Sequence, residues 1–365
     1  MRPAVLTFDP MVDVMTPGTP PATEERARAA AALRGAGIDI AVLSSVANVT
    51  YATGVETPVS FGAGAELTYA PWLAVFPTHG DGGALVAPRG SGKDAADNGF
   101  EPLAFATLDT WDAPDPEGTY LAQLHQALRL AGAKAGRGTL GVELRSLPVV
   151  AARAIERALP GWDIVDAEPA LRAARRTKTP REVDLLRRAA HLADVSHTTL
   201  AELVRESGRN ELAMFAEIGL AISQAAGRPV DLSGELVTGP RTTTVEYPNG
   251  PHDRVTRPGD AALMDLSGRL DGYWFDCTNT HAAEAAFTTF DLPMAHYAGH
   301  QVGVTVNELP RLVPYDHTPI EPGMVFCVEP GAYQGPGGTF GTRSEKMVLV
   351  TETGPEILST FAWGI

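Results

Sequence analysis

The stretch LMDLSGRLDGYWFD, Leu263 to Asp276, is typical of a strand, a turn and a second strand. Apolar residues flank the favoured turn dipeptide Asp271-Gly272. Asp265 and Asp276 lie symmetrically about residues 269–272, so the two carboxylates face each other across the hairpin if those four residues form the loop. Facing like charges favour a cation between them, although a solvated edge residue is the ordinary explanation for an isolated Asp pair.

Three later stretches also place a metal-binding residue type beside an apolar, strand-like run. They are HYAGHQVG with His296 and His300, MVFCVEPGAY with Glu329, and GTRSEKMVLV with Glu345. Together with the two aspartates, His300 and the two glutamates make a set of four carboxylates and one imidazole. This oxygen-rich set suits Mn²⁺, Co²⁺, Fe²⁺ or Zn²⁺, and bridging carboxylates can hold two ions about 3.5–4 Å apart.

The composition is that of a soluble globular protein. The 365 residues are long enough for two domains, and contents of 44% hydrophobic and 20% charged residues are ordinary. No run approaches the roughly 18 apolar residues of a membrane span, and we expect no signal peptide. The net charge of −15 argues against non-specific binding to nucleic acid or anionic lipid. Cys277 and Cys327 give no disulfide framework, so we expect inert buried thiols in a reducing cytoplasm.

The first 170 residues or so alternate helix and strand signals, which predicts an α/β layer domain. A helix is expected to begin at Thr23, and further helices near residues 120–131 and 147–159. Buried strands are expected at residues 38–44, 72–78, 83–87 and 140–144. No nucleotide-binding glycine motif is present.

The second half of the chain has a different pattern. Thr179, Pro180 and Glu182 form a capping box that opens a long helix. Asn210 caps a second helix that is expected to end near Gly227, and strands with glycine-rich turns follow. This order predicts an α+β domain.

The order and flanks of these stretches resemble the pita-bread metallopeptidases, the family of methionine aminopeptidase, aminopeptidase P, prolidase and creatinase. The matching pieces are DLSGRLDGYWFDCTNT, GHQVGVTVNELP, PGMVFCVEPGAY and RSEKMVLV, in the family's order. LRGAGIDIAVLSSVANVTYATG is similar to the creatinase/prolidase N-terminal domain. The resemblance implies an α/β N-terminal domain over residues 1–170 and an α+β pita-bread domain over residues 171–365.

By this resemblance five side chains bind two divalent metal ions, with Mn²⁺ foremost: Asp265, Asp276, His300, Glu329 and Glu345. Glu329 would also handle the proton of the attacking water. His296 matches a catalytic position, while Tyr333 and Arg343 match positions that line the substrate site. Glu308 is expected to have a supporting role rather than a ligand role.

Three positions depart from the family's pattern. The peptidases carry a histidine before the first aspartate, where this chain has Pro248 or Asn249 and a nearby His252. A second substrate histidine, seven residues after His300, is Asn307, and the usual Thr-Arg-Thr after the second aspartate is residues 278–280, Thr-Asn-Thr. Asparagine can donate a hydrogen bond to a substrate carbonyl but cannot act as an acid.

The interval from Asp276 to His300 is also short. It spans 24 residues, and THAAEAAFTTFDLP cannot supply the pair of helices that the peptidase relatives usually place there. Either this member lacks that helical unit, or the sequence omits a segment.

The resemblance implies hydrolysis of a short peptide or amide, closest to Xaa-Pro dipeptidase or aminopeptidase P, by a homodimer. One alternative keeps the fold and acts on a small metabolite, as creatinase or dimethylsulfoniopropionate lyase does; the missing histidines favour it. A second alternative is a non-catalytic interaction module, although such relatives usually lose the ligands. We expect slow cleavage of ordinary Xaa-Pro dipeptides.

Overall fold

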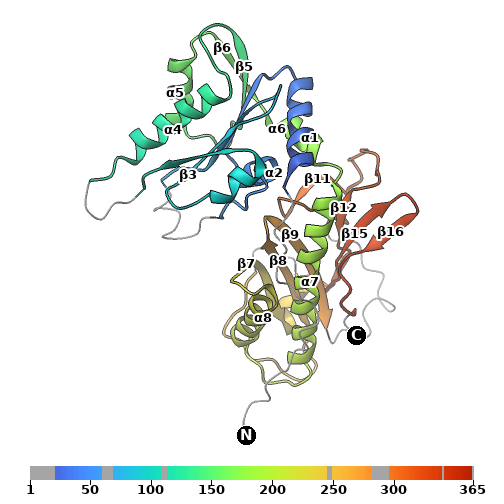
Figure 1. Ribbon diagram of the computed structural model, residues 1–365. Coiled ribbons are helices and arrows are strands. Elements are labelled where there is room, and N and C mark those ends of the chain that lie inside the picture. The colour runs from blue at the N-terminus through green and yellow to red at the C-terminus, as the bar shows by residue number, and fades with distance from the viewer. Residues whose placement is uncertain are drawn as a thin grey trace.

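The computed structural model describes residues 21–59, 69–107, 113–244, 249–281, 296–338 and 341–363. Figure 1 shows an N-terminal body of helices around a sheet and a C-terminal body in which long helices cover strands. None of the helices within the described ranges is both long and apolar enough to span a membrane.

The N-terminal body is the expected α/β layer structure. Its sheet has the order β4-β3-β2-β1-β5-β6 and mixes parallel with antiparallel pairs. The strands are β1 (Ile40–Leu43), β2 (Leu73–Pro77), β3 (Ala84–Pro88), β4 (Glu101–Phe105), β5 (Gly138–Val142) and β6 (Trp162–Asp166). The helices are α1 (Thr23–Gly35), α2 (Val46–Thr53), α4 (Pro116–Leu130), α5 (Val149–Ala158) and α6 (Glu168–Arg175), with the 3₁₀ turn η1 (Lys93–Asn98).

Strand β1 explains why this sheet carries helices on both faces. Ala41 and Leu43 pack into the apolar cluster that contains α1, while Ile40 and Val42 pack into the cluster that contains α4 and α5. A strand that is buried on both sides shows a continuous apolar run rather than an alternating one. The sequence of β1, Ile-Ala-Val-Leu, is such a continuous apolar run, and all four residues are buried.

The C-terminal body begins with two helices, α7 (Pro180–Leu203) and α8 (Glu211–Ala226). The Thr179 hydroxyl accepts from the Glu182 N–H and the Glu182 carboxylate accepts from the Thr179 N–H, so the predicted capping box is present. Asn210 caps α8 and Gly227 ends it in a left-handed conformation, as expected. Helix α7 packs on the strands that follow it (Figure 1).

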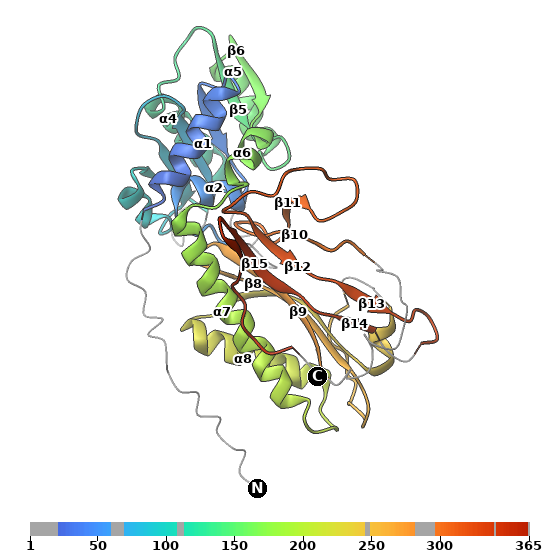
Figure 2. The same cartoon turned by 90° about the vertical axis from the view of Figure 1, so that its right-hand side faces the viewer.

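The strands of this body form two sheets and a short ribbon (Figure 2). The first sheet is β7 (Asp231–Thr238), β8 (Ala262–Leu270) and β9 (Tyr273–His281), with the 3₁₀ turn η2 (Gly239–Thr243) after β7. The second has the order β11-β10-β12-β15-β16, formed by β10 (Gly299–Gln301), β11 (Glu308–Arg311), β12 (Val325–Val328), β15 (Lys346–Thr351) and β16 (Gly354–Ile357). The ribbon pairs β13 (Gly331–Tyr333) with β14 (Gly341–Arg343).

The β8–β9 hairpin corrects one expectation. The loop is the two residues Asp271 and Gly272, whose φ angles are 50° and 86°, and the ladder therefore continues to the pair Leu270–Tyr273. This register pairs Asp265 with Thr278 and Asp276 with Ser267. The two aspartates lie on one face, two positions apart along the ladder, instead of directly opposite each other. A two-residue turn with positive φ fixed that register.

Candidate metal centre

The five predicted ligands come together from strands that are distant in the sequence. Carboxylate oxygens of Asp265 (β8), Asp276 (β9) and Glu345 (directly before β15) lie within 4.8 Å of one another. His300 Nε2 on β10 lies 3.5 Å from Asp276 Oδ2 and 3.5 Å from Glu329 Oε1. Glu329 follows β12 directly, so both sheets contribute side chains to this cluster.

The carboxylates are buried without enough hydrogen-bond donors. Among the described residues, Glu329 Oε1 and Glu345 Oε1 have no hydrogen-bond partner although both atoms are buried. Burial is the main cause that raises the pKa of Asp265 to about 8 and that of Glu329 to about 7. Burial, followed by the charges of Asp276 and Glu329, raises the pKa of Glu345 well above its ordinary value. Bound divalent cations would neutralise the repulsion between the carboxylates and would contact the oxygen atoms that lack hydrogen-bond partners. The residues present therefore fit the divalent metal ions expected from the sequence.

The tautomer of His300 suits a ligand. Its Nδ1 lies 2.9 Å from the Gln301 carbonyl oxygen, which can only accept, so the proton sits on Nδ1 in the neutral ring. Nε2 is thereby left as the lone-pair atom that faces the carboxylates. Burial opposes protonation, but the hydrogen bond and charge of Asp276, the hydrogen bond to Gln301 and the charge of Glu329 together raise the His300 pKa.

Arg343 ties one side of the cluster together. Its Nη2 donates to Asp265 Oδ2 at 2.5 Å and to Glu235 Oε2 at 2.7 Å, and its Nη1 donates to the Tyr333 hydroxyl at 2.9 Å. Glu235 is buried on β7, directly opposite Asp265 in the ladder. Sequence reasoning placed Tyr333 and Arg343 at the site but missed Glu235, because only the β7–β8 register makes it a neighbour.

A second group of polar and aromatic side chains lies near His300. Asn307 Nδ2 lies 3.4 Å from the Tyr297 hydroxyl, and Asn307 Oδ1 accepts from Arg311 Nε at 3.2 Å. The Arg311 guanidinium lies 5.6 Å from the centre of the Tyr297 ring, and Arg311 pairs with His300 across β10 and β11. Sequence reasoning missed Tyr297 and Arg311. Tyr297 could have been found from its position three residues before His300, whereas Arg311 is a neighbour only through the β10–β11 register.

His296 lies beside both Tyr297 and Tyr333. Its Nδ1 is 2.8 Å from the Tyr297 carbonyl oxygen, which leaves Nε2 as an acceptor, and that buried atom has no partner within the described part of the chain. The His296 and Tyr333 ring centres are 6.0 Å apart. Burial, followed by the charge of Arg343, lowers the pKa of His296. A neutral imidazole with a free acceptor atom therefore faces the site.

The departures from the family's pattern have different structural consequences. Asn249 accepts from Arg241 Nη2 at 2.7 Å, and the exposed His252 uses its backbone N–H to bind Glu211; Pro248 lies outside the described residues. Asn279 Nδ2 donates to the Ala362 carbonyl at 3.0 Å. Because side chains alternate along β9, Asn279 points away from the face that carries Asp276. The short interval falls largely on residues 282–295, which lie outside the described residues.

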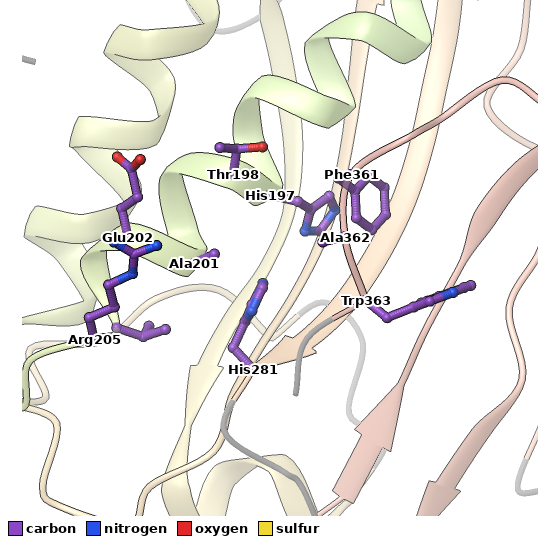
Figure 3. A pocket seen from close by; sticks show the side chains of 10 residues that line it. His197, Thr198, Ala201, Glu202, Arg205, His281, Phe361, Ala362 and Trp363 are labelled. Carbon is purple, nitrogen blue, oxygen red and sulfur yellow. The ribbon is translucent and has the colours of Figure 1, made fainter. Parts of the chain in front are cut away.

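A cavity of about 510 Å³ lies on the other face of β9, between α7 and the C-terminal segment (Figure 3). The rings of His197, His281 and Phe361 line it. The His197 Nε2 lies 3.0 Å from the Cys277 carbonyl oxygen, and alternation along β9 directs Cys277 and His281 away from the carboxylates. This cavity is therefore separate from the candidate metal centre.

Comparisons with known proteins agree with this geometry. The model of metallopeptidase family M24 matches residues 184–290 and 279–352, and that of the creatinase/prolidase N-terminal domain matches residues 26–177. The chain is 27% identical over 369 residues to the probable dipeptidase PepE of Mycobacterium tuberculosis, covering 90% of this chain and 92% of PepE. It is 25% identical over 223 residues to the Xaa-Pro dipeptidase of Pyrococcus furiosus, covering 50% of this chain and 62% of that protein. The solved Xaa-Pro dipeptidase of Bacillus anthracis has a similar fold, with a TM-score of 0.70 at 19% identity, covering 94% of this chain and 99% of that one.

Proposed function

The chain belongs to metallopeptidase family M24 and is a metal-dependent hydrolase with a creatinase/prolidase N-terminal domain, and we propose that its substrates are dipeptides, Xaa-Pro dipeptides among them. The observation that carries the proposal is a cluster of four carboxylates and one imidazole, in which His300 Nε2 lies 3.5 Å from Asp276 Oδ2 and from Glu329 Oε1. Two buried carboxylate oxygens of this cluster have no hydrogen-bond partner among the described residues. Buried carboxylates in such a cluster cost folding free energy unless cations pair with them.

We assign the ligand roles to Asp265, Asp276, His300, Glu329 and Glu345. When bound, two divalent ions would supply Lewis acidity and lower the pKa of water toward neutrality. The carboxylate-rich set favours Mn²⁺, with Co²⁺, Fe²⁺ or Zn²⁺ as alternatives.

The remaining chemistry belongs to the chain's own side chains. Glu329 Oε1 has no hydrogen-bond partner among the described residues and is therefore available to accept the proton of the attacking water and return it to the leaving amine. His296 offers the lone pair of Nε2 to a substrate N–H. The Asn307 amide N–H can donate a hydrogen bond to the scissile carbonyl oxygen. Arg343, which also binds the Tyr333 hydroxyl, holds Asp265 in position.

Arg311 is the basis for choosing a dipeptide rather than a longer peptide. It is solvent-exposed, pairs with His300 across the ladder, and is held through Nε by Asn307 and over the ring of Tyr297. Its two Nη groups are oriented as a unit and can bind a carboxylate in a bidentate manner. A dipeptide has its free C-terminal carboxylate one residue from the scissile bond, and Arg311, on the strand beside His300, is the side chain that we assign to it.

Two finer points belong to the same proposal. The two cysteines are both free and buried, which supports a reducing compartment such as the cytoplasm. We also propose a homodimer, as the family resemblance implies.

The test compares a panel of dipeptides, their C-terminal amides, and small non-peptide amides with the metal-loaded full-length protein. We expect hydrolysis of the dipeptides and at least a tenfold lower kcat/KM for the matched C-terminal amides, because loss of a charged hydrogen bond costs about 1.5–3 kcal/mol. Arg311→Ala should remove that preference, whereas Arg153→Ala, exposed on α5, should keep it. Equal rates on the dipeptides and their amides would contradict a dipeptidase, and hydrolysis of the small amides alone would favour a metabolite hydrolase.

A further inference from the structure

Cys327 lies inside the candidate metal centre. Its Sγ, a His300 ring nitrogen and a Glu345 carboxylate oxygen lie within 4.8 Å of one another, and the three residues are 0%, 2% and 1% exposed. Cys327 on β12 pairs directly with His300 on β10 and with Met347 on β15. Cross-strand partners share a face of the sheet, so the thiol and the imidazole point to the same side.

Glu345 belongs to two groups of three candidate ligands that differ in their donor atoms. One triad, Asp265, Asp276 and Glu345, offers only oxygen atoms, and the other, His300, Cys327 and Glu345, offers nitrogen, sulfur and oxygen. Glu345 Oε2 accepts from the Thr278 hydroxyl at 2.8 Å, whereas the buried Oε1 has no partner among the residues that the structure describes. An unpartnered carboxylate oxygen between the two triads is a second sign, independent of the cysteine, that a cation belongs there.

We propose that Cys327 is a ligand at one of the two metal positions and makes that position selective for Zn²⁺ or Co²⁺, while the all-oxygen position keeps its preference for Mn²⁺. The inference rests on the proposed dinuclear function and assigns a different metal preference to each position. Thiolate is a soft ligand that favours Zn²⁺ over Mn²⁺, whereas carboxylates suit the harder ion. On metal binding the S–H bond is broken, a metal–sulfur bond forms, and the proton leaves to the solvent.

The distances allow this coordination after a small adjustment. Zinc bonds of about 2.0–2.3 Å in a tetrahedral arrangement place ligand atoms roughly 3.3–3.6 Å apart. The three candidate atoms lie within 4.8 Å, so side-chain movements of about 1 Å bring them to that spacing. The Cys327 thiol now donates to the Asp276 carbonyl at 3.4 Å, a weak contact that a metal–sulfur bond would replace.

Cys277 provides a matched control. It is also fully buried and follows the ligand Asp276 directly in the sequence. Alternation along β9 directs its side chain to the opposite face, toward α7. The two cysteines are therefore equally buried, and each lies within two residues of a ligand in the sequence, but they occupy opposite faces of the strands.

The experiment loads chelator-treated full-length protein with Co²⁺ and records the near-ultraviolet absorption, in which a cobalt–thiolate bond produces a charge-transfer band. We expect the band in the wild type and in Cys277→Ser, and its loss in Cys327→Ser. Two bound Co²⁺ per wild-type chain without the band would overturn the role of Cys327 while leaving the proposed function intact. A band that persists in Cys327→Ser would also overturn it, and absence of any Co²⁺ binding would overturn the proposed function itself.

A second measurement does not depend on cobalt. Competition with a chelator should show that Cys327→Ser lowers Zn²⁺ affinity by tenfold or more, since even residues that only support a ligand contribute about 10–100-fold. The affinity for the first equivalent of Mn²⁺ should change by less than about twofold, because the all-oxygen position remains. Equal losses for both ions would show that the serine variant perturbs the whole centre and that Cys327 has no selective role.

Discussion

Lys178 Nζ lies 2.9 Å from Glu308 Oε2, and the two side chains are only 0% and 5% exposed. Lys178 also donates to Gln301 Oε1 at 3.3 Å, and Glu308 Oε1 lies 3.7 Å from Arg175 Nε. Arg175 in turn donates to Asn48 on α2. This buried network joins the N-terminal body to β10 and β11, the strands that carry His300 and border Asn307, and it gives Glu308 the supporting role expected from the sequence.

Removal of one partner of this pair should therefore be costly. Lys178→Met leaves the Glu308 carboxylate buried with a single distant cation, and breaking a buried pair typically destabilises a protein by about 3–5 kcal/mol. Arg187→Met is the control, because its 2.9 Å pair with Glu356 is exposed, at 44% and 43%, and such pairs contribute at most about 1 kcal/mol. Urea unfolding of both variants measures the difference. Equal small losses would show that the Lys178–Glu308 pair is not a structural link.

Several features of this fold could be predicted from local sequence. The capping box at Thr179 and the caps at Asn210 and Gly227 depend on neighbouring residues alone, and all three are present. The five candidate ligands could be named because each lies in a recognisable short motif. The neighbours of those ligands could not, because they depend on register: Glu235 is opposite Asp265 only through the β7–β8 ladder.

The same reasoning explains the error at the β8–β9 hairpin. Composition identified Asp271-Gly272 as the turn, but the symmetry of Asp265 and Asp276 suggested a loop of four residues. The length of the loop, two residues or four, decides which residues of the two strands pair. The symmetry of the two aspartates in the sequence does not show which loop length is adopted. The predicted proximity of the aspartates survived because a displacement of two positions keeps both on one face.

Metal binding should stabilise the protein through Glu345. Its buried carboxylate lies near the carboxylates of Asp276, Glu329 and Asp265. Without bound metal ions these negative charges repel one another. Mn²⁺ or Co²⁺ at about 100 times the dissociation constant should stabilise the folded state by about 2.7 kcal/mol, seen as a higher Tm. Glu345→Ala and Asp265→Ala should reduce both the bound metal and this shift, and abolish turnover.

Glu352→Gln is the matched control for this prediction, since Glu352 is exposed beyond the end of β15. It should keep the metal content and the Tm shift of the wild type. A melting curve of the wild type that millimolar Mn²⁺ or Co²⁺ leaves unchanged would argue against convergent ligands.

The pH dependence of stability should include a contribution from Glu182. Its carboxylate is buried, accepts from Thr179 N at 2.9 Å and from the Tyr273 hydroxyl at 3.2 Å, and burial raises its pKa to about 7 from 4.5. Because the folded state holds the proton more tightly, this contribution is fully present below about pH 4.5 and is lost as pH rises through about 7. The slope is at most about 1.4 kcal/mol per pH unit.

Glu182→Gln isolates that contribution. The amide can accept from Thr179 with its oxygen and donate to the Tyr273 hydroxyl with its nitrogen, so both contacts have a replacement. Unfolding free energies measured from pH 5 to pH 8 should fall less steeply for Glu182→Gln than for the wild type. Identical slopes would mean that Glu182 titrates in the folded protein as it does in the unfolded chain.

The last prediction concerns the amide that replaces a family histidine. Asn307 is held by Tyr297 and Arg311 at the edge of the site, so it can bind a carbonyl oxygen but cannot donate a proton to the leaving amine. General acid assistance is typically worth about 10²–10⁴-fold, so Asn307→His should raise kcat on Xaa-Pro dipeptides, whereas Asn307→Gln, which keeps an amide, should not. Steady-state kinetics of the three proteins on one Xaa-Pro dipeptide decides the matter. A wild-type kcat/KM of about 10⁵ M⁻¹s⁻¹ or more would be ordinary for an enzyme on its own substrate. Together with no gain in Asn307→His, that value would show that this centre cleaves the Xaa-Pro bond without help from an imidazole at residue 307.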